Sequence, residues 1–201
     1  MLDVMTKYTG AKTVFGYNNV FFSDGYCFAT NGYICAYCKT DDDRTWAINA
    51  DNYRENLDFS TEKEKVRIKK MLDRILDISH FVPLLEFTLD LQKSKDFQKF
   101  KQLIRAKTKK KQRQLVIDSL IKEVYVKDLA EDCIYTIDDN LISSSFFNTK
   151  LESIYTVYLQ DIVNLVKATK KAINFKIGDF KEHKIVLLTS GEYKVVMYSI
   201  K

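Results

Sequence analysis

The sequence predicts an α+β protein, with antiparallel strands near both ends of the chain and helices in the middle. Asp-Gly and Asn-Gly pairs separate short apolar runs near the N-terminus, which is typical of tight hairpins. Near the C-terminus the apolar period changes from helical to strand-like. A length of 201 residues with 46% hydrophobic and 13% aromatic residues is enough for a sizeable buried core, so we expect a folded chain.

The N-terminal part is predicted to begin with a short helix over 1–8 and to continue as a β meander. The meander follows from the turn pairs, because glycine and asparagine adopt the positive φ that tight turns require. A further short strand is expected at 46–48. The strands of the meander are expected at 12–17, 20–23, 26–30 and 33–39.

The middle of the chain is predicted to be helical. Glu64 stands three residues after Thr61, which is the spacing of a capping box, and apolar residues then recur at helical intervals to about Ile78. Pro83 interrupts the pattern, and a strand or a buried connector is expected around it, over 81–91. A second helix is expected over 96–104.

The last part of the chain is predicted to be a strand, a helix and three strands. Leu159, Ile162 and Val166 share one face of the helix. A polar stripe of Gln160, Asn164, Lys167 and Lys171 lies on the opposite face. The lysines of this stripe either complement the helix dipole or turn a basic face toward a polyanion. The strands of this unit are expected at 154–157, 173–177, 184–189 and 193–200, after earlier strands around 124–126, 133–136 and 141–147.

Positive charge is concentrated in one segment. Residues 93–113 contain ten Lys or Arg and one acid, so the segment carries +9 while the other 180 residues carry −4. Such asymmetry indicates an anionic partner, although a solvated helical surface explains a charge run equally well. Phe97 and Phe100 in this segment have a spacing that is more typical of a core face than of a base-stacking platform.

No catalytic residue, metal site or cofactor is expected. Cys35 and Cys38 form a CxxC motif, but it falls in a predicted strand, which favours buried structural cysteines over a redox or zinc site. His80 and His183 have no nucleophile at motif spacing, and the sequence holds no glycine-rich phosphate loop. Four cysteines favour a reducing, cytoplasmic setting, and no apolar run reaches membrane-spanning length, so no membrane partner is expected.

Two stretches of the chain resemble a known family. Residues 158–168 read YLQDIVNLVKA and precede the three C-terminal strands, and residues 27–35 read CFATNGYIC. Together they resemble the last helix, the terminal strands and a characteristic turn of the bacterial β sliding clamp, the ring that tethers DNA polymerase to its template. Residues 146–148 are similar to the strand before the clamp helix.

The resemblance implies a clamp-like domain formed by 1–59 and 115–201 and interrupted by a helical, basic insertion at 60–114. A bacterial clamp strings three such domains together, whereas this sequence has room for one. The ending Tyr198-Ser199-Ile200-Lys201 departs from the family pattern. A clamp-like domain is therefore favoured over a complete clamp.

The resemblance also implies a non-enzymatic role in DNA replication or repair. A clamp contacts duplex DNA through lysines and arginines that touch phosphates without reading bases. Few such contacts bind weakly, so a ring would have to assemble several copies as a homo-oligomer. The alternative is a protein-binding module that holds a replication protein without binding DNA. The candidate DNA contacts are Lys7, Lys167, Lys170 and Lys171 from the resemblance, and Arg105, Lys107, Lys109, Lys110, Lys111 and Arg113 from the basic segment.

Overall fold

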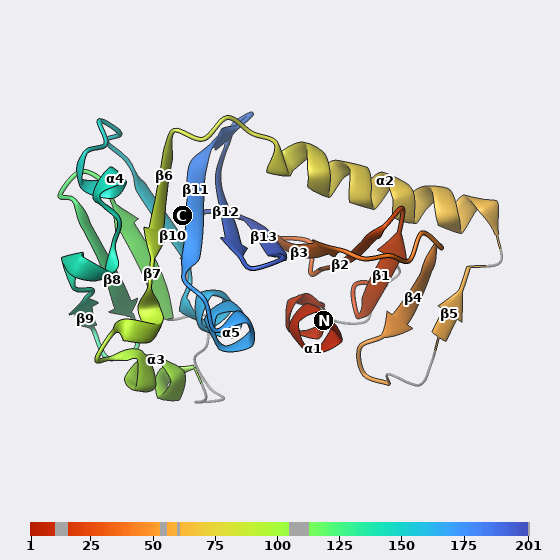
Figure 1. The fold of residues 1–201 in the computed structure, drawn as a ribbon, viewed down its shortest axis with the longest axis horizontal. Coiled ribbons are helices and arrows are strands. Elements are labelled where there is room, and N and C mark those ends of the chain that lie inside the picture. Colours follow the sequence, from red (N-terminus) through yellow and green to blue (C-terminus); the bar gives the residue numbers. More distant parts are fainter. Residues whose placement is uncertain (11–15, 53–55, 60, 105–112, 201) are drawn as a thin grey trace. The chain divides into compact units, whose positions relative to one another are not determined.

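The computed structural model describes residues 1–10, 16–52, 56–59, 61–104 and 113–200 (Figure 1). The chain forms two compact units. Unit 1 comprises Met1–Phe81 and Glu192–Met197, and unit 2 comprises Val82–Gly191 and Tyr198–Lys201. The fold is α+β, as predicted, with antiparallel sheets and a few helices.

Unit 1 contains an antiparallel sheet in which neighbouring strands follow the order β5-β4-β1-β2-β3-β13. The Asp24-Gly25 turn between β1 and β2 has φ values of 49° and 74°, the positive φ that the sequence predicted for this hairpin. The predicted strands of the meander are confirmed from residue 20 onward. Of the strand predicted at 12–17, residues 12–15 lie outside the described residues, and Gly16 (φ 67°) and Tyr17 lie in a turn before β1 and not in a strand. The strands are β1 (Asn19–Ser23), β2 (Tyr26–Thr30), β3 (Ile34–Lys39), β4 (Trp46–Asn49), β5 (Asn56–Asp58) and β13 (Tyr193–Tyr198).

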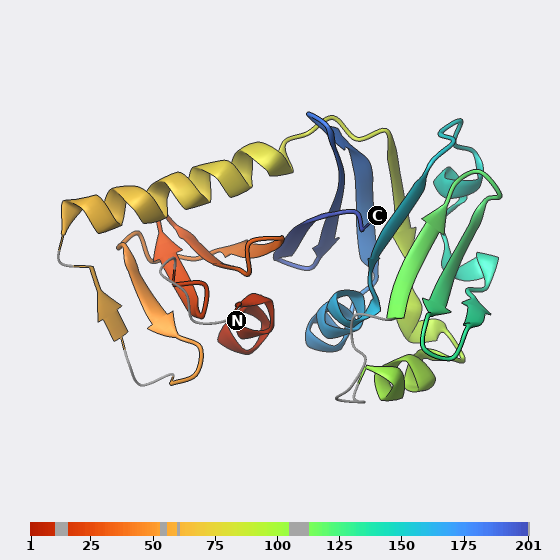
Figure 2. The ribbon, with the colours of Figure 1, turned by 180° about the vertical axis from the view of Figure 1, so that it is seen from behind.

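Helices lie on the two faces of this sheet, as Figures 1 and 2 show. The first is α1 (Leu2–Met5), which continues into the short 3-10 helix η1 (Thr6–Tyr8). The second is α2 (Glu62–Ser79), which begins with the predicted capping box between Thr61 and Glu64. It buries Ile68, Leu72 and Ile75, the apolar stripe that the sequence predicted.

Unit 2 contains two antiparallel groups of strands. One group has the order β12-β11-β6, and the other is a four-stranded sheet of order β10-β7-β8-β9. Aromatic rings fill part of its core, because Phe87 stacks on Phe175 at 4.9 Å and contacts Phe146 at 5.0 Å between ring centroids. The strands are β6 (Leu85–Leu89), β7 (Arg113–Asp118), β8 (Glu123–Asp128), β9 (Cys133–Thr136), β10 (Ile154–Tyr158), β11 (Ile173–Phe180) and β12 (His183–Ser190).

Two of the three α-helices described in unit 2 were predicted as helices, and the third was predicted as a strand. The second helix of the middle is α3 (Phe97–Leu103), and the C-terminal helix is α5 (Leu159–Thr169). The predicted strand at 141–147 is wrong, because this region forms the 3-10 helix η4 (Asp139–Leu141) and the short helix α4 (Ser144–Phe147). Phe146 is buried against Phe87 from that helical turn, which is why an apolar run here does not form a strand. A further 3-10 helix, η2, spans Leu91–Lys93.

The division into two units differs from the predicted division into 1–59 with 115–201 and an insertion at 60–114. The segment 60–114 supplies parts of both units: α2 packs in unit 1, and β6 pairs with β11 in unit 2. Paired β strands and a buried helix face tie this segment into the two cores. That the segment is an insertion stays a prediction.

Candidate nucleic-acid interface

Helix α5 positions three of the lysines that the sequence singled out. The helix packs against α3 and against strands β7, β10 and β12 of unit 2. Its buried side includes Leu159, Ile162 and Val166, as the helical spacing predicted. This packing fixes the helix on the strands, so the end of the helix has a defined position.

The C-terminal end of α5 holds its lysines in place through a set of hydrogen bonds. Lys170 caps the helix in the left-handed conformation (φ 51°, ψ 40°), and its N–H donates to Val166 O at 2.8 Å. The Thr169 hydroxyl donates to Leu165 O and contacts Ser190 Oγ on β12 at 2.7 Å. Lys167, Lys170 and Lys171 are all exposed at this end of the helix.

The polar stripe of α5 is less open to solvent than predicted. Asn164 is only 8% exposed, so the stripe is interrupted in the middle of the helix. The neighbouring Asp161 is also 8% exposed, and burial raises its pKa to about 7. The positive charge of α5 is therefore concentrated at its C-terminal end, where it also complements the helix dipole.

Lys7 belongs to unit 1. It lies on η1 and is exposed, while Met5 and Tyr8 on either side of it are buried. The 3-10 turn thus directs the apolar neighbours to the core and Lys7 to solvent.

The described part of the basic segment has structural contacts of its own. Phe97 and Phe100 are buried in unit 2, which confirms that their spacing is that of a core face. The Lys93 ammonium lies 2.9 Å from the Asp90 carboxylate, and Lys99 Nζ lies 4.1 Å from the centre of the Tyr135 ring. Arg105, Lys107, Lys109, Lys110 and Lys111 lie outside the described residues.

Arg113 is held inside unit 2. Its side chain is 7% exposed, its Nε donates to Asp128 Oδ2 at 2.8 Å, and its Nη1 donates to Leu103 O at 2.6 Å. Burial acts to raise the pKa of Asp128, but the hydrogen bond and charge of Arg113, together with the backbone N–H groups of Ala130 and Glu131, outweigh burial, and the pKa is lowered. Arg113 joins β7 to β8 and to the end of α3, so we leave it out of the candidate interface.

The cysteines of the CxxC motif lie in a strand, as predicted. Cys38 is buried on β3 and faces Cys27 across the β2–β3 ladder, and Cys35 is half-buried. Within the described residues, no cluster of three or more His, Cys, Asp or Glu side chains could hold a metal ion. None of the described helices is long and apolar enough to span a bilayer.

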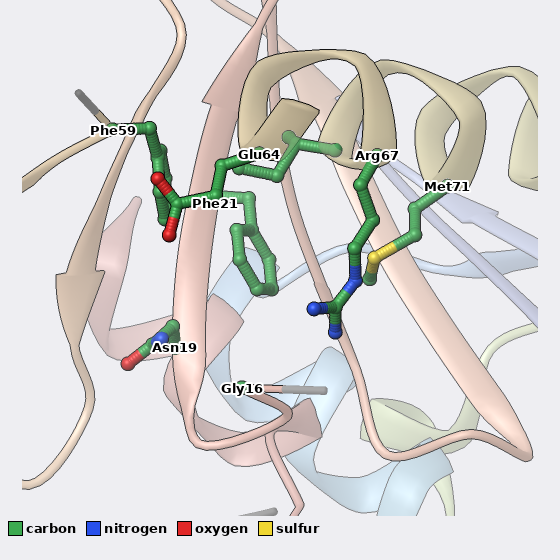
Figure 3. Close-up of a pocket in the computed structure, with 8 residues that line it drawn as sticks. Gly16, Asn19, Phe21, Phe59, Glu64, Arg67 and Met71 are labelled. Atoms are coloured by element: carbon green, nitrogen blue, oxygen red, sulfur yellow. The ribbon is translucent and has the colours of Figure 1, made fainter. Parts of the chain in front are cut away.

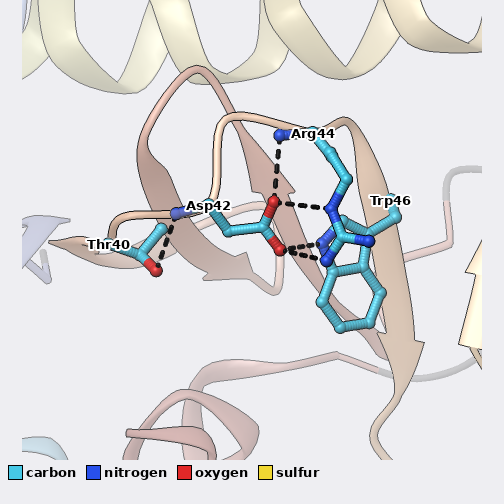
Figure 4. A network of polar contacts seen from close by, with 4 residues as sticks. All are labelled: Thr40, Asp42, Arg44 and Trp46. Atoms are coloured by element: carbon cyan, nitrogen blue, oxygen red, sulfur yellow. Dashed lines mark hydrogen bonds and ion pairs between the residues drawn. The ribbon is translucent and has the colours of Figure 1, made fainter.

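Sequence reasoning missed one cluster of aromatic and cationic side chains in unit 1. It surrounds Trp46 at the start of β4, where Asp42 accepts hydrogen bonds from Arg44 and from Trp46 Nε1 (Figure 4). The sequence signal for this cluster was the chain's only tryptophan, which stands two residues after Arg44 and close to the acidic run Asp41-Asp42-Asp43. The second aromatic side chain of the cluster, Phe59, is distant in sequence, and the β4–β5 pairing brings it near.

Comparison with known proteins finds similarity in structure but not in sequence. No protein-family model and no curated protein matches the sequence. Solved structures of bacterial DNA polymerase III β subunits match the whole chain. The β subunit of Streptococcus pyogenes aligns with a TM-score of 0.65 at 8% identity, over 100% of this chain and 62% of that one.

Two further solved structures give the same result. The β subunit of Pseudomonas aeruginosa has a TM-score of 0.64 at 9% identity and is covered over 63% of its length. The Helicobacter pylori β clamp, solved with a DNA ligase peptide, has a TM-score of 0.62 at 9% identity and is covered over 62%. All of this chain is matched in both cases. The chain therefore spans about three fifths of the length of these clamps and has a divergent form of their fold.

Proposed function

From the fold that it shares with bacterial sliding clamps, we propose that this chain is a non-enzymatic, clamp-like protein of DNA replication or repair. It contacts duplex DNA through phosphates and docks replication proteins. The proposed setting is the cytoplasm. The proposed contacts are Lys7, Lys167, Lys170 and Lys171, together with Arg105, Lys107, Lys109, Lys110 and Lys111 of the basic segment.

The observation that carries the DNA contact in this proposal is the group of exposed lysines at the end of α5. Lys167, Lys170 and Lys171 come from the last turn of the helix and the residues just after it, on a rigid support. Lysine ammonium groups bind phosphates as point charges and do not discriminate between bases. That chemistry suits a protein that holds DNA without reading its sequence.

A few lysines bind duplex DNA only weakly, and the binding depends strongly on salt. Several copies of the chain around one duplex would multiply these contacts, since linked sites bind with a high effective concentration. The proposal therefore includes a homo-oligomer.

The test is the binding of a fluorescently labelled duplex, followed by anisotropy as salt is varied. We expect binding at low salt that weakens as salt rises, with a slope of log K against log salt of about −0.9 for each phosphate contact. The double variant Lys167→Gln/Lys171→Gln should bind several-fold more weakly and reduce that slope by about 2.

A matched control is Lys150→Gln/Lys181→Gln, which removes the same charge from exposed positions of unit 2. Lys181 follows β11 at the end opposite to Lys171, so this variant should bind as the parent protein does. Equal losses in the two double variants would mean that only net charge matters. Absence of duplex binding at low salt would refute the DNA contact itself.

A protein-binding module is the second candidate function, and two exposed apolar side chains favour it. Val82 and Leu84 flank Pro83 in unit 2 and are 80% and 52% exposed. Large apolar side chains at such exposure suit the docking of a partner's apolar residue. If Val82→Ser/Leu84→Ser abolishes capture of a purified replication protein while duplex binding is absent in the parent protein, this second function holds instead.

A further inference from the structure

Two buried cysteines face each other in the sheet of unit 1. Cys27 on β2 and Cys38 on β3 are directly opposite in the antiparallel register, and they are 0% and 2% exposed. Directly opposite residues of an antiparallel pair point to the same face of the sheet. Both thiols are free, and they share a hydrogen bond. Cys27 and Cys38 therefore form a dithiol that spans two neighbouring strands.

The dithiol points away from helix α2. Figure 3 shows the Phe21 ring of β1 beside Arg67 and Met71 of α2. Phe28 of β2 stacks on Phe21, with 5.3 Å between the ring centroids. Cys27 is the neighbour of Phe28 and points to the other face, because successive side chains of a strand alternate. The 3-10 helix η1 contacts β2 and β3 and covers that face (Figure 1).

The CxxC motif does not supply this pair. Cys35 stands three positions before Cys38 on β3, so the two side chains point to opposite faces of the sheet. The Cys35 thiol donates to Thr30 Oγ1 at 3.1 Å. Cys38 therefore has its thiol partner on the neighbouring strand and not within the motif.

The backbone holds the dithiol within bridging distance. Thr40 N donates to Gly25 O at 2.9 Å, two positions along the ladder from Cys27 and Cys38, so the cysteines also occupy a hydrogen-bonded pair of positions. The Cα atoms of such a pair are about 5.5 Å apart, inside the range of about 4.4–6.8 Å that disulfides span.

A bond between these two sulfur atoms would be strained. Opposite Cβ atoms of an antiparallel pair are about 4.5–5.5 Å apart, whereas a disulfide holds them about 3.8 Å apart. The bond would draw β2 and β3 together locally. Strained disulfides are more easily reduced than relaxed ones, so a bond at this position is reversible.

The shared hydrogen bond prepares Cys38 as the nucleophile. The bond from the Cys27 thiol lowers the pKa of Cys38, and the same bond together with burial raises the pKa of Cys27. The thiolate is the reactive form of cysteine. Cys38 stands next to the exposed Lys39 at the end of β3, and the ends of elements open locally at little cost, which admits a small oxidant.

We propose that Cys27 and Cys38 are a redox-sensitive site that hydrogen peroxide oxidises to a disulfide. The Cys38 thiolate attacks one peroxide oxygen, so an S–O bond forms, the O–O bond breaks, and the hydroxide that leaves takes up the proton lost by Cys38. The Cys27 sulfur then attacks Cys38 Sγ, so the S–S bond forms, the S–O bond breaks, and water leaves with the Cys27 proton. The two thiols lose two electrons, and the peroxide gains them.

The expected role of such a bond is regulatory. In a reducing compartment, disulfides are usually transient and serve catalysis or redox sensing. The dithiol uses none of the residues of the proposed duplex interface. This inference therefore does not depend on the proposed function.

The test is a map of the cysteines in the full chain after exposure to hydrogen peroxide. Remaining thiols are blocked with N-ethylmaleimide in denaturant, and the unreduced protein is cut with chymotrypsin. This protease cleaves at the aromatic residues between Cys27, Cys35 and Cys38, so each cysteine falls on its own peptide. We expect a cross-linked pair that joins the Cys27 and Cys38 peptides, with a mass lower than their sum by two hydrogen atoms. Reduced glutathione should restore all four free thiols.

Serine variants separate the roles of the cysteines. Cys35→Ser is the matched control, since it removes the thiol nearest to Cys38 in sequence but neither member of the dithiol, and it should form the cross-link as the parent protein does. Cys27→Ser should stop at a sulfenic acid on Cys38, which dimedone traps. Cys38→Ser should give neither product. Thermal unfolding of each variant is measured, and if a dithiol variant does not fold, the maps of the parent protein and Cys35→Ser decide the question.

Three results would overturn the proposal. The first is a folded protein whose dithiol resists peroxide that oxidises the urea-unfolded chain. The second is a cross-link between Cys35 and Cys38 in place of the expected one. The third is loss of the cross-link in Cys35→Ser.

Discussion

Asp161 is an acidic side chain that unit 2 buries on helix α5. Burial raises its pKa to about 7, since the charged form is poorly solvated there. The unfolded value is near 4. The folded state thus holds a proton more tightly than the unfolded chain does. Protonation of Asp161 therefore makes the folded protein more stable than it is with the charged carboxylate. This stabilisation is complete below about pH 4 and is lost as the pH rises toward 7.

Asp161→Asn tests this effect. At pH 8 the variant should be more stable than the parent protein, by at most a few kcal/mol, since each pKa unit corresponds to about 1.4 kcal/mol. At pH 4 the two proteins should differ little, because Asp161 is then largely protonated. Urea unfolding at both pH values measures the difference. A variant that is less stable than the parent at pH 8 would show that the contacts of the Asp161 carboxylate stabilise the fold by more than its burial costs.

Arg113 shows how a basic residue acquires a structural role. Sequence alone places it at the end of a basic run, where a phosphate contact is a reasonable hypothesis. The structure pairs it with Asp128 across β7 and β8, with both side chains almost fully buried. Loss of one partner of such a pair typically costs about 3–5 kcal/mol. A DNA-binding defect in an Arg113 variant would therefore need a stability control.

At the scale of the element, the end of α5 is strained. Lys170 adopts φ 51° at the C-cap, a conformation that a side chain with a Cβ disfavours and that glycine adopts freely. The position of the three lysines thus depends on the packing of Thr169 against Ser190 more than on a favourable cap.

Lys170→Gly should stabilise the protein by about 1 kcal/mol, because it relieves the left-handed strain. Lys170→Ala is the matched control: it removes the same charge but keeps the Cβ, so its thermal stability should not rise. Both variants should lose the same affinity for duplex DNA if the Lys170 charge contacts phosphate. A gain in stability with alanine equal to that with glycine would contradict the role of the backbone conformation.

At the scale of the whole molecule, the chain contains two compact units and covers about three fifths of the bacterial clamps that it resembles. Proposed phosphate contacts occur in both units, Lys7 in unit 1 and the α5 lysines in unit 2. A few weak contacts in one chain do not hold DNA at physiological salt. Enclosure of a duplex requires additional copies or additional domains.

Light scattering at the concentration that saturates duplex binding tests whether copies assemble. We expect a mass of more than one chain, and we expect it to depend on protein concentration. The Lys167→Gln/Lys171→Gln variant is the control, since it should keep the same mass while it loses DNA affinity. A strictly monomeric mass for the parent protein would exclude a self-assembled ring.

Most elements could be predicted because their signals are local. The hairpin at Asp24-Gly25, the Thr61–Glu64 capping box and the apolar face of α5 each depend on residues a few positions apart. The region 141–147 was mispredicted because a short apolar run fits a strand and a helical turn equally well. Packing of Phe146 against Phe87 decides between them.

The candidate sites were predictable only in part. Lys7 and the α5 lysines are exposed, and their exposure follows from the helical and 3-10 spacing of their apolar neighbours. The burial of Asn164 and Asp161 could not be predicted, because it depends on what packs around α5. The burial of Arg113 could not be predicted either, because its partner, Asp128, lies on the neighbouring strand β8.

By itself, the sequence determined the α+β class, most element boundaries, the resemblance to a clamp and the absence of a recognisable catalytic motif, since periodicity, turn residues and motifs are properties of neighbouring positions. The tertiary structure decided the division into two units, the burial of Arg113 with Asp128, and the meeting of Phe59 with Trp46 and Arg44. These features depend on which strands pair and which faces pack. Such contacts join residues that are far apart in the chain, so local sequence patterns do not predict them.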